Sequence, residues 1–154
     1  MKVYTLVREQ LVRRPLKETF DFFADPNNLE AITPAWLKFS VVSTPAELQA
    51  GSRIVYRLKW HGISLRWKTD IEVWEPPIRF VDSQKSGPYA LWRHTHTFVA
   101  QGEDTLTTDH VDYAIHLGPM GMIAHAAVVK RDVEAIFNYR RERIAELLDR
   151  GSPR

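Results

Sequence analysis

Hydrophobic and polar positions alternate through the middle of the chain. From Ile54 to Trp60, and again from Ile63 to Val73, nearly every second residue is apolar or aromatic, and the residues between are mostly polar or charged. This period of two predicts β-strands with one buried face. The two-residue connection His61-Gly62 predicts a hairpin, and other short turns follow, so we expect antiparallel strands that pair with their sequence neighbours.

Helical spacing flanks these strands. A first strand, Val3–Val12, precedes two predicted short helices, Leu16–Ala24 and Leu29–Ile32. Beyond Gly118-Pro119, apolar residues recur every three or four positions from about Met120 to Arg150, which predicts one long helix with a single apolar stripe. That stripe includes Ile123, Ala126, Ala127, Val133, Ile136, Phe137, Ile144, Leu147 and Leu148.

The order of these elements predicts an α+β fold. About seven antiparallel strands form a curved sheet, and one face of such a sheet must be covered. The long C-terminal helix is the only element large enough to cover it, and a ligand can lie between the two layers. We expect a single domain over residues 1–150 and a disordered tail over residues 151–154.

One strand combines histidines with aromatic residues. Between Trp92 and Phe98 the alternation places Trp92, His94, His96 and Phe98 on one face. An aromatic face normally points into a core, and two titratable rings there need partners or a cavity.

The same alternation assigns other side chains to the inner face. Asp82 and Gln84 share the parity of Phe80, and Asp109 shares that of Tyr113, whereas Trp74 and His110 are predicted to face outward. His116 and His125 are expected to be exposed. The predicted ligand-binding set is Tyr56, Trp67, Thr69, Asp82, Gln84, Trp92, His94, His96, Asp109 and Tyr113.

Three interpretations of the polar inner face stay open. The first is a self-satisfied network in which Asp82 or Asp109 accepts from a histidine and Tyr113 closes it. In the second, the histidines and Tyr113 donate to a ligand carbonyl, phenol or carboxylate. The third is a metal site of two histidines and a carboxylate, but His-x-His alone is a weak signal, so the sequence predicts no metal and no cofactor.

Composition narrows the possible partners. The 154 residues carry a net charge of +2 and no cysteine, which excludes disulfides and thiolate chemistry. The basic residues gather on the C-terminal helix among acidic ones, which is typical of a solvated helix face rather than a nucleic-acid interface. No apolar run approaches the length of a membrane span, so we expect a cytoplasmic protein without membrane insertion, and homodimerisation stays open.

Several segments carry a resemblance to a known superfamily. They are Phe23-Ala24-Asp25-Pro26-Asn27-Asn28-Leu29 with Ile32-Thr33-Pro34, Gly51 through Tyr56, Trp67-Lys68-Thr69, Pro76-Pro77 with Phe80 and Asp82, Gly87-Pro88-Tyr89 with Trp92 to Phe98, and Asp109-His110-Val111-Asp112-Tyr113. With the order of elements, they resemble the SRPBCC superfamily (START, Bet v 1 and polyketide cyclases), in particular its small stand-alone bacterial ligand-binding branch. The resemblance implies a helix-grip fold. It does not select a function, because the superfamily includes carriers, receptors, cyclases and RNases.

The sequence therefore favours binding of a small hydrophobic or amphipathic molecule, lipid- or polyketide-like, in an internal cavity. One alternative is a cyclase- or dehydratase-type enzyme, with His94 or His96 as acid–base and Asp and Tyr partners. A second alternative is a protein-interaction or regulatory module, which would have an exposed apolar patch in place of a sizeable cavity.

Overall fold

The protein is seen in a computed structural model that describes residues 1–149, so the predicted tail at 151–154 lies outside the described residues. Seven strands form one antiparallel sheet in the order β1-β7-β6-β5-β4-β3-β2. Their bounds are β1 Tyr4–Val12, β2 Ser40–Ser43, β3 Arg53–Trp60, β4 Ile63–Glu75, β5 Arg79–Ser86, β6 Leu91–Gln101 and β7 Asp104–Ala114. Apart from β1, each strand pairs with its neighbours in sequence, as short connections require.

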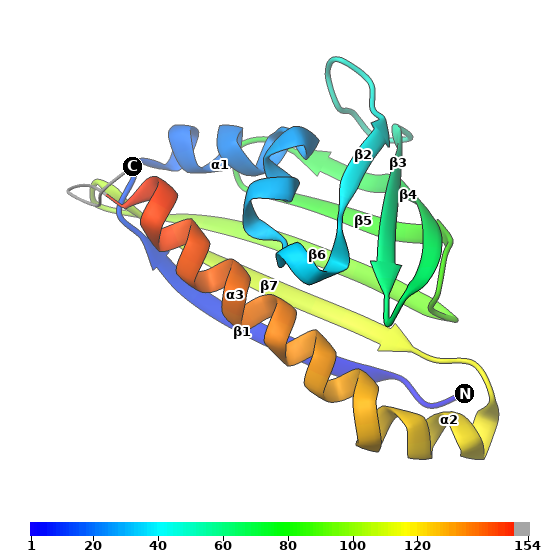
Figure 1. Ribbon diagram of the computed structural model, residues 1–154. Coiled ribbons are helices and arrows are strands. Elements are labelled where there is room, and N and C mark those ends of the chain that lie inside the picture. The colour runs from blue at the N-terminus through cyan, green and yellow to red at the C-terminus, as the bar shows by residue number, and fades with distance from the viewer. Residues whose placement is uncertain (150–154) are drawn as a thin grey trace.

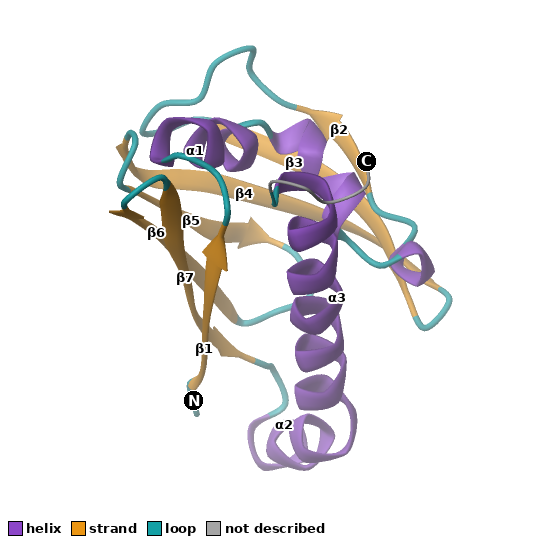
Figure 2. Cartoon of the chain, turned by 90° about the vertical axis from the view of Figure 1, so that its left-hand side faces the viewer, coloured by secondary structure: helices purple, strands orange, loops and turns teal. Residues whose placement is uncertain are grey.

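The helices lie on one side of this sheet. They are α1 Leu16–Ala24, the 3₁₀ turns η1 Pro26–Ile32 and η2 Ala35–Leu37, α2 Gly118–Ala124, the π-helical turn η3 His125–Val129, and α3 Lys130–Leu148. The sheet curves, and α3 crosses its concave side (Figures 1 and 2). This arrangement confirms the predicted helix-grip fold.

The local signals explain most of the element boundaries. The β3–β4 hairpin has positive φ at both His61 and Gly62, the geometry of a type I′ turn. The second predicted short helix is a 3₁₀ turn that begins earlier, at Pro26, because the Asp25 side chain accepts a hydrogen bond from the Asn27 backbone N–H.

A β-bulge overturns one prediction of sidedness. The β4–β5 register shifts between Ile71 and Val73, and the extra residue reverses the parity of the end of β4. Trp74 therefore faces the core, where its ring lies 5.5 Å from Phe20 and 5.4 Å from Phe80. The predicted outward orientation of Trp74 and inward orientation of Val73 are wrong.

The long helical run is also less uniform than its apolar stripe predicts. Val133, Phe137 and Ile144 are buried against the sheet, whereas Ile123 is 71% exposed and Ala126 and Ala127 are exposed. The π-helical turn shifts the helix phase between α2 and α3, so one stripe does not continue across both. The helical period is correct, but burial of the whole stripe is not.

Candidate functional site

A cavity of about 380 Å³ lies between the concave face of the sheet, α3 and the 3₁₀ turns. Its volume falls in the range of small-molecule sites. Most of its wall is apolar, and its aromatic lining consists of Phe23, Phe39, Tyr56, Trp60, Trp67, Phe80, Tyr89, Trp92 and Phe137. The cavity reaches the surface near His116 and Leu117, two exposed lining residues.

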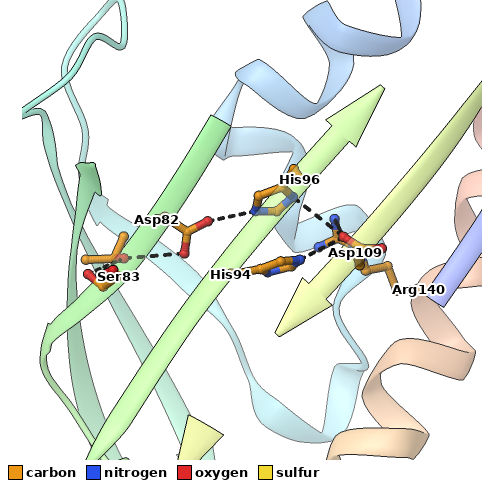
Figure 3. A network of polar contacts seen from close by, with 7 residues as sticks. Asp82, Ser83, His94, His96, Asp109 and Arg140 are labelled. Atoms are coloured by element: carbon orange, nitrogen blue, oxygen red, sulfur yellow. Dashed lines mark hydrogen bonds and ion pairs between the residues drawn. The ribbon is translucent and has the colours of Figure 1, made fainter. Parts of the chain in front are cut away.

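The two histidines of β6 form the centre of a polar group at the cavity wall. Both are only 5% exposed, and their rings stack with centroids 3.6 Å apart. His94 Nε2 lies 2.7 Å from Asp109 Oδ1, and His96 Nε2 lies 2.7 Å from Asp82 Oδ2. Asp82 and Asp109 thus flank the histidine pair from the two neighbouring strands (Figure 3).

These contacts are diagonal across the sheet. In the backbone register Asp82 lies opposite His94, and Asp109 lies opposite His96. Each histidine makes its 2.7 Å contact with the other carboxylate, on the other neighbouring strand. That carboxylate lies two residues from the histidine's direct partner on that strand, and long side chains can cover this diagonal distance. Parity alone identifies the four residues, but it does not decide which of them pair.

Arg140 of α3 completes the polar group. Its Nη2 lies 3.5 Å from Asp109 Oδ1, and its guanidinium lies 5.3 Å from the Phe23 ring centroid and 5.8 Å from that of Phe137. The side chain is buried, so the prediction that the basic residues of the C-terminal helix form a solvated face is wrong for Arg140. A signal was available, because Val133, Phe137, Arg140 and Ile144 follow the four-three-four spacing of a buried helix face.

The charges of this group follow from its contacts. Burial alone would raise the pKa of Asp82, but the hydrogen bond from His96 and the positive charges nearby outweigh it, and the pKa lies below its usual value. Burial opposes ionisation of Asp109 as well, yet Arg140 and the His94 hydrogen bond hold its pKa far lower. Both carboxylates are therefore ionised at neutral pH and accept hydrogen bonds.

Burial and hydrogen bonding also determine the protonation of His96. Burial, reinforced by the neighbouring His94, lowers the pKa of His96 to about 4 despite the hydrogen bond to Asp82. At neutral pH the ring is uncharged and donates its Nε2–H to Asp82. Its Nδ1, 3.6 Å from Asp109 Oδ1, carries a lone pair.

The remaining predicted site residues divide into two sets. Tyr56, Trp67 and Trp92 line the cavity, together with Asp82, His94 and His96. Thr69, Gln84, Asp109 and Tyr113 lie outside the lining, and each of them contacts other residues of the protein. The Thr69 hydroxyl donates to the Ser83 carbonyl at 2.9 Å, and the Gln84 amide exchanges hydrogen bonds with the Tyr89 backbone. Asp109 lies behind His94 and orients it.

Tyr113 belongs to a different contact. Its hydroxyl lies 2.7 Å from His125 Nε2, and the His125 ring stacks on Tyr4 with centroids 3.4 Å apart. Tyr113 therefore does not close the histidine network. His125 is buried at 6% exposure, so the prediction that it is exposed is wrong, whereas His116 is exposed as predicted.

One charged lining residue, Asp132 of α3, is not predicted by any sequence pattern. Asp132 Oδ2 accepts from Trp60 Nε1 at 2.8 Å and lies 2.8 Å from His61 Nε2. These contacts join the β3–β4 hairpin to the start of α3. Asp132 lies at a helical position whose partner comes from a distant hairpin, so sequence spacing carries no signal for it.

One group of side chains could hold a metal ion. Asp82, His94 and His96 each place a ligand atom within 4.8 Å of the others, and two imidazoles with one carboxylate suit a divalent transition metal. Both Nε2 atoms already contact carboxylates, so coordination through them requires these hydrogen bonds to break. The absence of a metal site stays a prediction.

No helix within residues 1–149 combines the length and the apolar character needed to cross a membrane.

Solved structures share this fold. A protein from Thermus thermophilus matches with a TM-score of 0.66 and 22% identity, over 92% of this chain and 97% of that one. A protein from Chromobacterium violaceum gives a TM-score of 0.74 at 13% identity, over 94% and 97% of the two chains. The major latex-like protein 151 of Panax ginseng gives 0.58 at 18% identity, over 86% and 96%.

Sequence comparison identifies the family. No curated protein matches the chain significantly. The family described as "Polyketide cyclase / dehydrase and lipid transport" matches residues 12–136, which include most of the sheet and the first part of α3. By this match, which covers most of its length, the chain belongs to the polyketide cyclase/dehydrase and lipid transport family.

Proposed function

We propose that this protein binds a small hydrophobic or amphipathic molecule in the cavity between the sheet and α3. The observation that carries the proposal is the cavity of about 380 Å³, which has aromatic walls and one group of polar side chains. Apolar walls supply binding energy through burial of the ligand body, and a few fixed polar groups orient its head. Membership of a family described by lipid transport and cyclase activity supports the same proposal.

The proposal can be tested with a fluorescent ligand and a blocked cavity. The purified protein should enhance the fluorescence of N-phenyl-1-naphthylamine, a neutral aromatic probe, in a saturable manner. Val129→Trp places a large side chain in the cavity lining and should abolish saturable binding. Val128→Trp is the matched control, because Val128 is 38% exposed and lies outside the lining. Equal binding by both variants would contradict the proposed site.

Acid–base catalysis is a second candidate function. The observation in its favour is that His94 and His96 line the cavity and that each lies 2.7 Å from a carboxylate. A carboxylate that fixes the tautomer of an imidazole leaves the other ring nitrogen available as a general base. Such a base could remove a proton next to a ketone, the first step of an aldol-type cyclisation or a dehydration.

A simple ketone separates binding from catalysis. If the histidines act as bases, the protein should accelerate exchange of the methyl protons of 2-acetonaphthone in D₂O, followed by NMR. His94→Gln or His96→Gln should then reduce exchange on the order of a hundredfold. In a protein that only binds, the same substitutions should change affinity by at most about tenfold, the contribution of a single hydrogen bond. Exchange that is no faster than with Val129→Trp would reject catalysis.

A further inference from the structure

We propose that the cavity selects ligands whose polar head donates a hydrogen bond and is neutral or cationic, and that it discriminates against carboxylates. The inference rests on the proposed function, because it assumes that a ligand occupies the cavity. It goes further by assigning the chemical class of the head group.

The charges at the cavity wall disfavour an anionic head group. Among the described lining residues other than histidine, Asp82, Asp132 and Arg140 are the charged ones. Asp109 lies directly behind His94 and is already in contact with both His94 and Arg140. The cavity wall and the side chain directly behind it thus hold three carboxylates but one guanidinium, and a ligand carboxylate would add a fourth negative charge.

Protonation of His96 does not restore the balance at the polar end. His96 has a pKa of about 4 because it is buried, so it is neutral at pH 7. A ligand carboxylate would be attracted to the Arg140 guanidinium, whose buried Nε has no hydrogen-bond partner among the described residues, but Asp109 Oδ1 already lies 3.5 Å from Arg140 Nη2 and offsets part of its charge. Since the attraction to Arg140 is opposed by repulsion from Asp82 and Asp109, a carboxylate gains little there.

The hydrogen-bonding groups of the cavity favour a head group that donates a hydrogen bond. Asp82 Oδ1 has a single weak contact, with the Thr69 hydroxyl at 3.5 Å, and so retains capacity to accept. On the donor side, Tyr56 lines the cavity, and burial raises the pKa of its hydroxyl, with the Asp82 carboxylate adding to the effect. A head group that donates to Asp82 and accepts from Tyr56, such as an alcohol, a phenol or an enol, satisfies both.

The aromatic walls also favour a neutral or cationic head group. Tyr56, Trp67 and Trp92 line the cavity as Asp82 does, and the negative faces of aromatic rings attract cations and donor hydrogens but not anions. The walls and the excess of carboxylates therefore favour the same class of head group. The attraction of cations to aromatic faces and carboxylates makes a protonated amine an acceptable head group as well.

Three ligands that share one body test the proposal. They are 2-naphthalenemethanol, 2-naphthylmethylamine and 2-naphthoate, titrated into the protein at pH 7.5 by isothermal titration calorimetry. We expect the alcohol and the amine to bind at least tenfold more tightly than the carboxylate. Equal or tighter binding of 2-naphthoate would overturn the proposal while leaving the proposed function intact. Failure of all three to bind would instead contradict the proposed function.

Two substitutions assign the discrimination to the charges. Asp82→Asn should reduce the preference for the alcohol over the carboxylate by at least threefold, and Arg140→Gln should increase it. Asp70→Asn is the control, because Asp70 pairs with Arg53 on the outer face of β4 and should leave the preference unchanged. If Asp82→Asn does not fold, as judged by circular dichroism, Asp132→Asn should reduce the preference in the same direction but by less, because Asp132 lines the cavity near the β3–β4 hairpin and not at the polar end. An unchanged preference in the folded variant would overturn the role of the carboxylates.

Discussion

The two ends of the cavity differ in how their side chains are held. At the polar end, His94, His96 and Arg140 are buried, and each contacts a carboxylate. At the opening, the segment from Leu117 to Val128 presents apolar side chains to the surface: Leu117 is 69% exposed, Met120 69% and Ile123 71%. Charged groups therefore lie inside and large apolar groups outside, the reverse of the usual distribution.

This reversal has a physical basis at each end. Buried charges are tolerated where each one has a partner at close range, as the histidines and carboxylates have here. The exposed apolar segment forms the lip of the opening, where α2 turns away from the sheet and no described element covers it. Stability should therefore depend strongly on the closed part of the molecule and weakly on the opening.

The largest expected difference comes from two isoleucines of the same helical run. Ile144→Ala removes a side chain that is 2% exposed in α3 and should reduce the free energy of unfolding by about 3–4 kcal/mol. Ile123→Ala removes one at the opening and should change it by less than about 0.5 kcal/mol. Urea denaturation of both variants measures the difference. Similar losses would show that the opening is packed in solution.

The polar end should also make stability depend on pH. The His96 pKa of about 4 lies below the value near 6.5 of an unfolded chain, so the unfolded state binds more protons between these limits. The free energy of unfolding should fall by about 3 kcal/mol as the pH is lowered from about 6.5 to 4. Protonation of Asp82 and Asp109, whose pKa values are also low, adds to the loss in stronger acid.

Two histidine variants identify the residue responsible for this pH dependence of stability. His96→Gln should flatten the change in stability between pH 6.5 and 4, whereas His116→Gln, at the exposed edge of the opening, should leave the slope intact. Thermal denaturation at fixed pH intervals gives both slopes. An unchanged slope in His96→Gln would mean that His96 is not a neutral buried group.

The smallest expected effect concerns the contact that joins the opening to the sheet. Tyr113→Phe removes the 2.7 Å hydrogen bond to His125 and should cost about 1 kcal/mol. Tyr139→Phe, at a half-buried tyrosine of α3, should change the free energy of unfolding by less than about 0.5 kcal/mol. A double-mutant cycle of Tyr113→Phe with His125→Phe measures the coupling between the two side chains. A coupling near zero would contradict the contact.

The sequence predicted the sheet more accurately than the helix. Side chains alternate along a strand with a period of two, and a turn marks each end of the strand. The inner faces of β3 and β6 were therefore predicted correctly. The prediction failed at Trp74, because a bulge adds one residue to β4 without a sequence signal of its own. On the helix, the apolar stripe correctly described Val133 to Ile144 but not Ile123, since periodicity reports a face and not what covers that face.

The candidate site was predictable to a similar extent. Parity brought Asp82, His94, His96 and Asp109 to one inner face, but it could not distinguish direct from diagonal pairs. Arg140 could have been recognised from its spacing with Val133 and Phe137. The contact of Asp132 with Trp60 joins residues 72 positions apart, and local spacing carries no information about it.

The sequence by itself determined which residues share the inner face wherever a strand has no bulge, because the alternation of side chains is a local property of each strand. It also determined the order of the elements and, with that order, the helix-grip fold. Only the tertiary structure decided which carboxylate each histidine contacts, where Arg140 places its charge and which part of the helical run stays uncovered. These depend on strand register, a bulge and the path of α3 across the sheet, and such long-range distances have no counterpart in the spacing of residues along the chain.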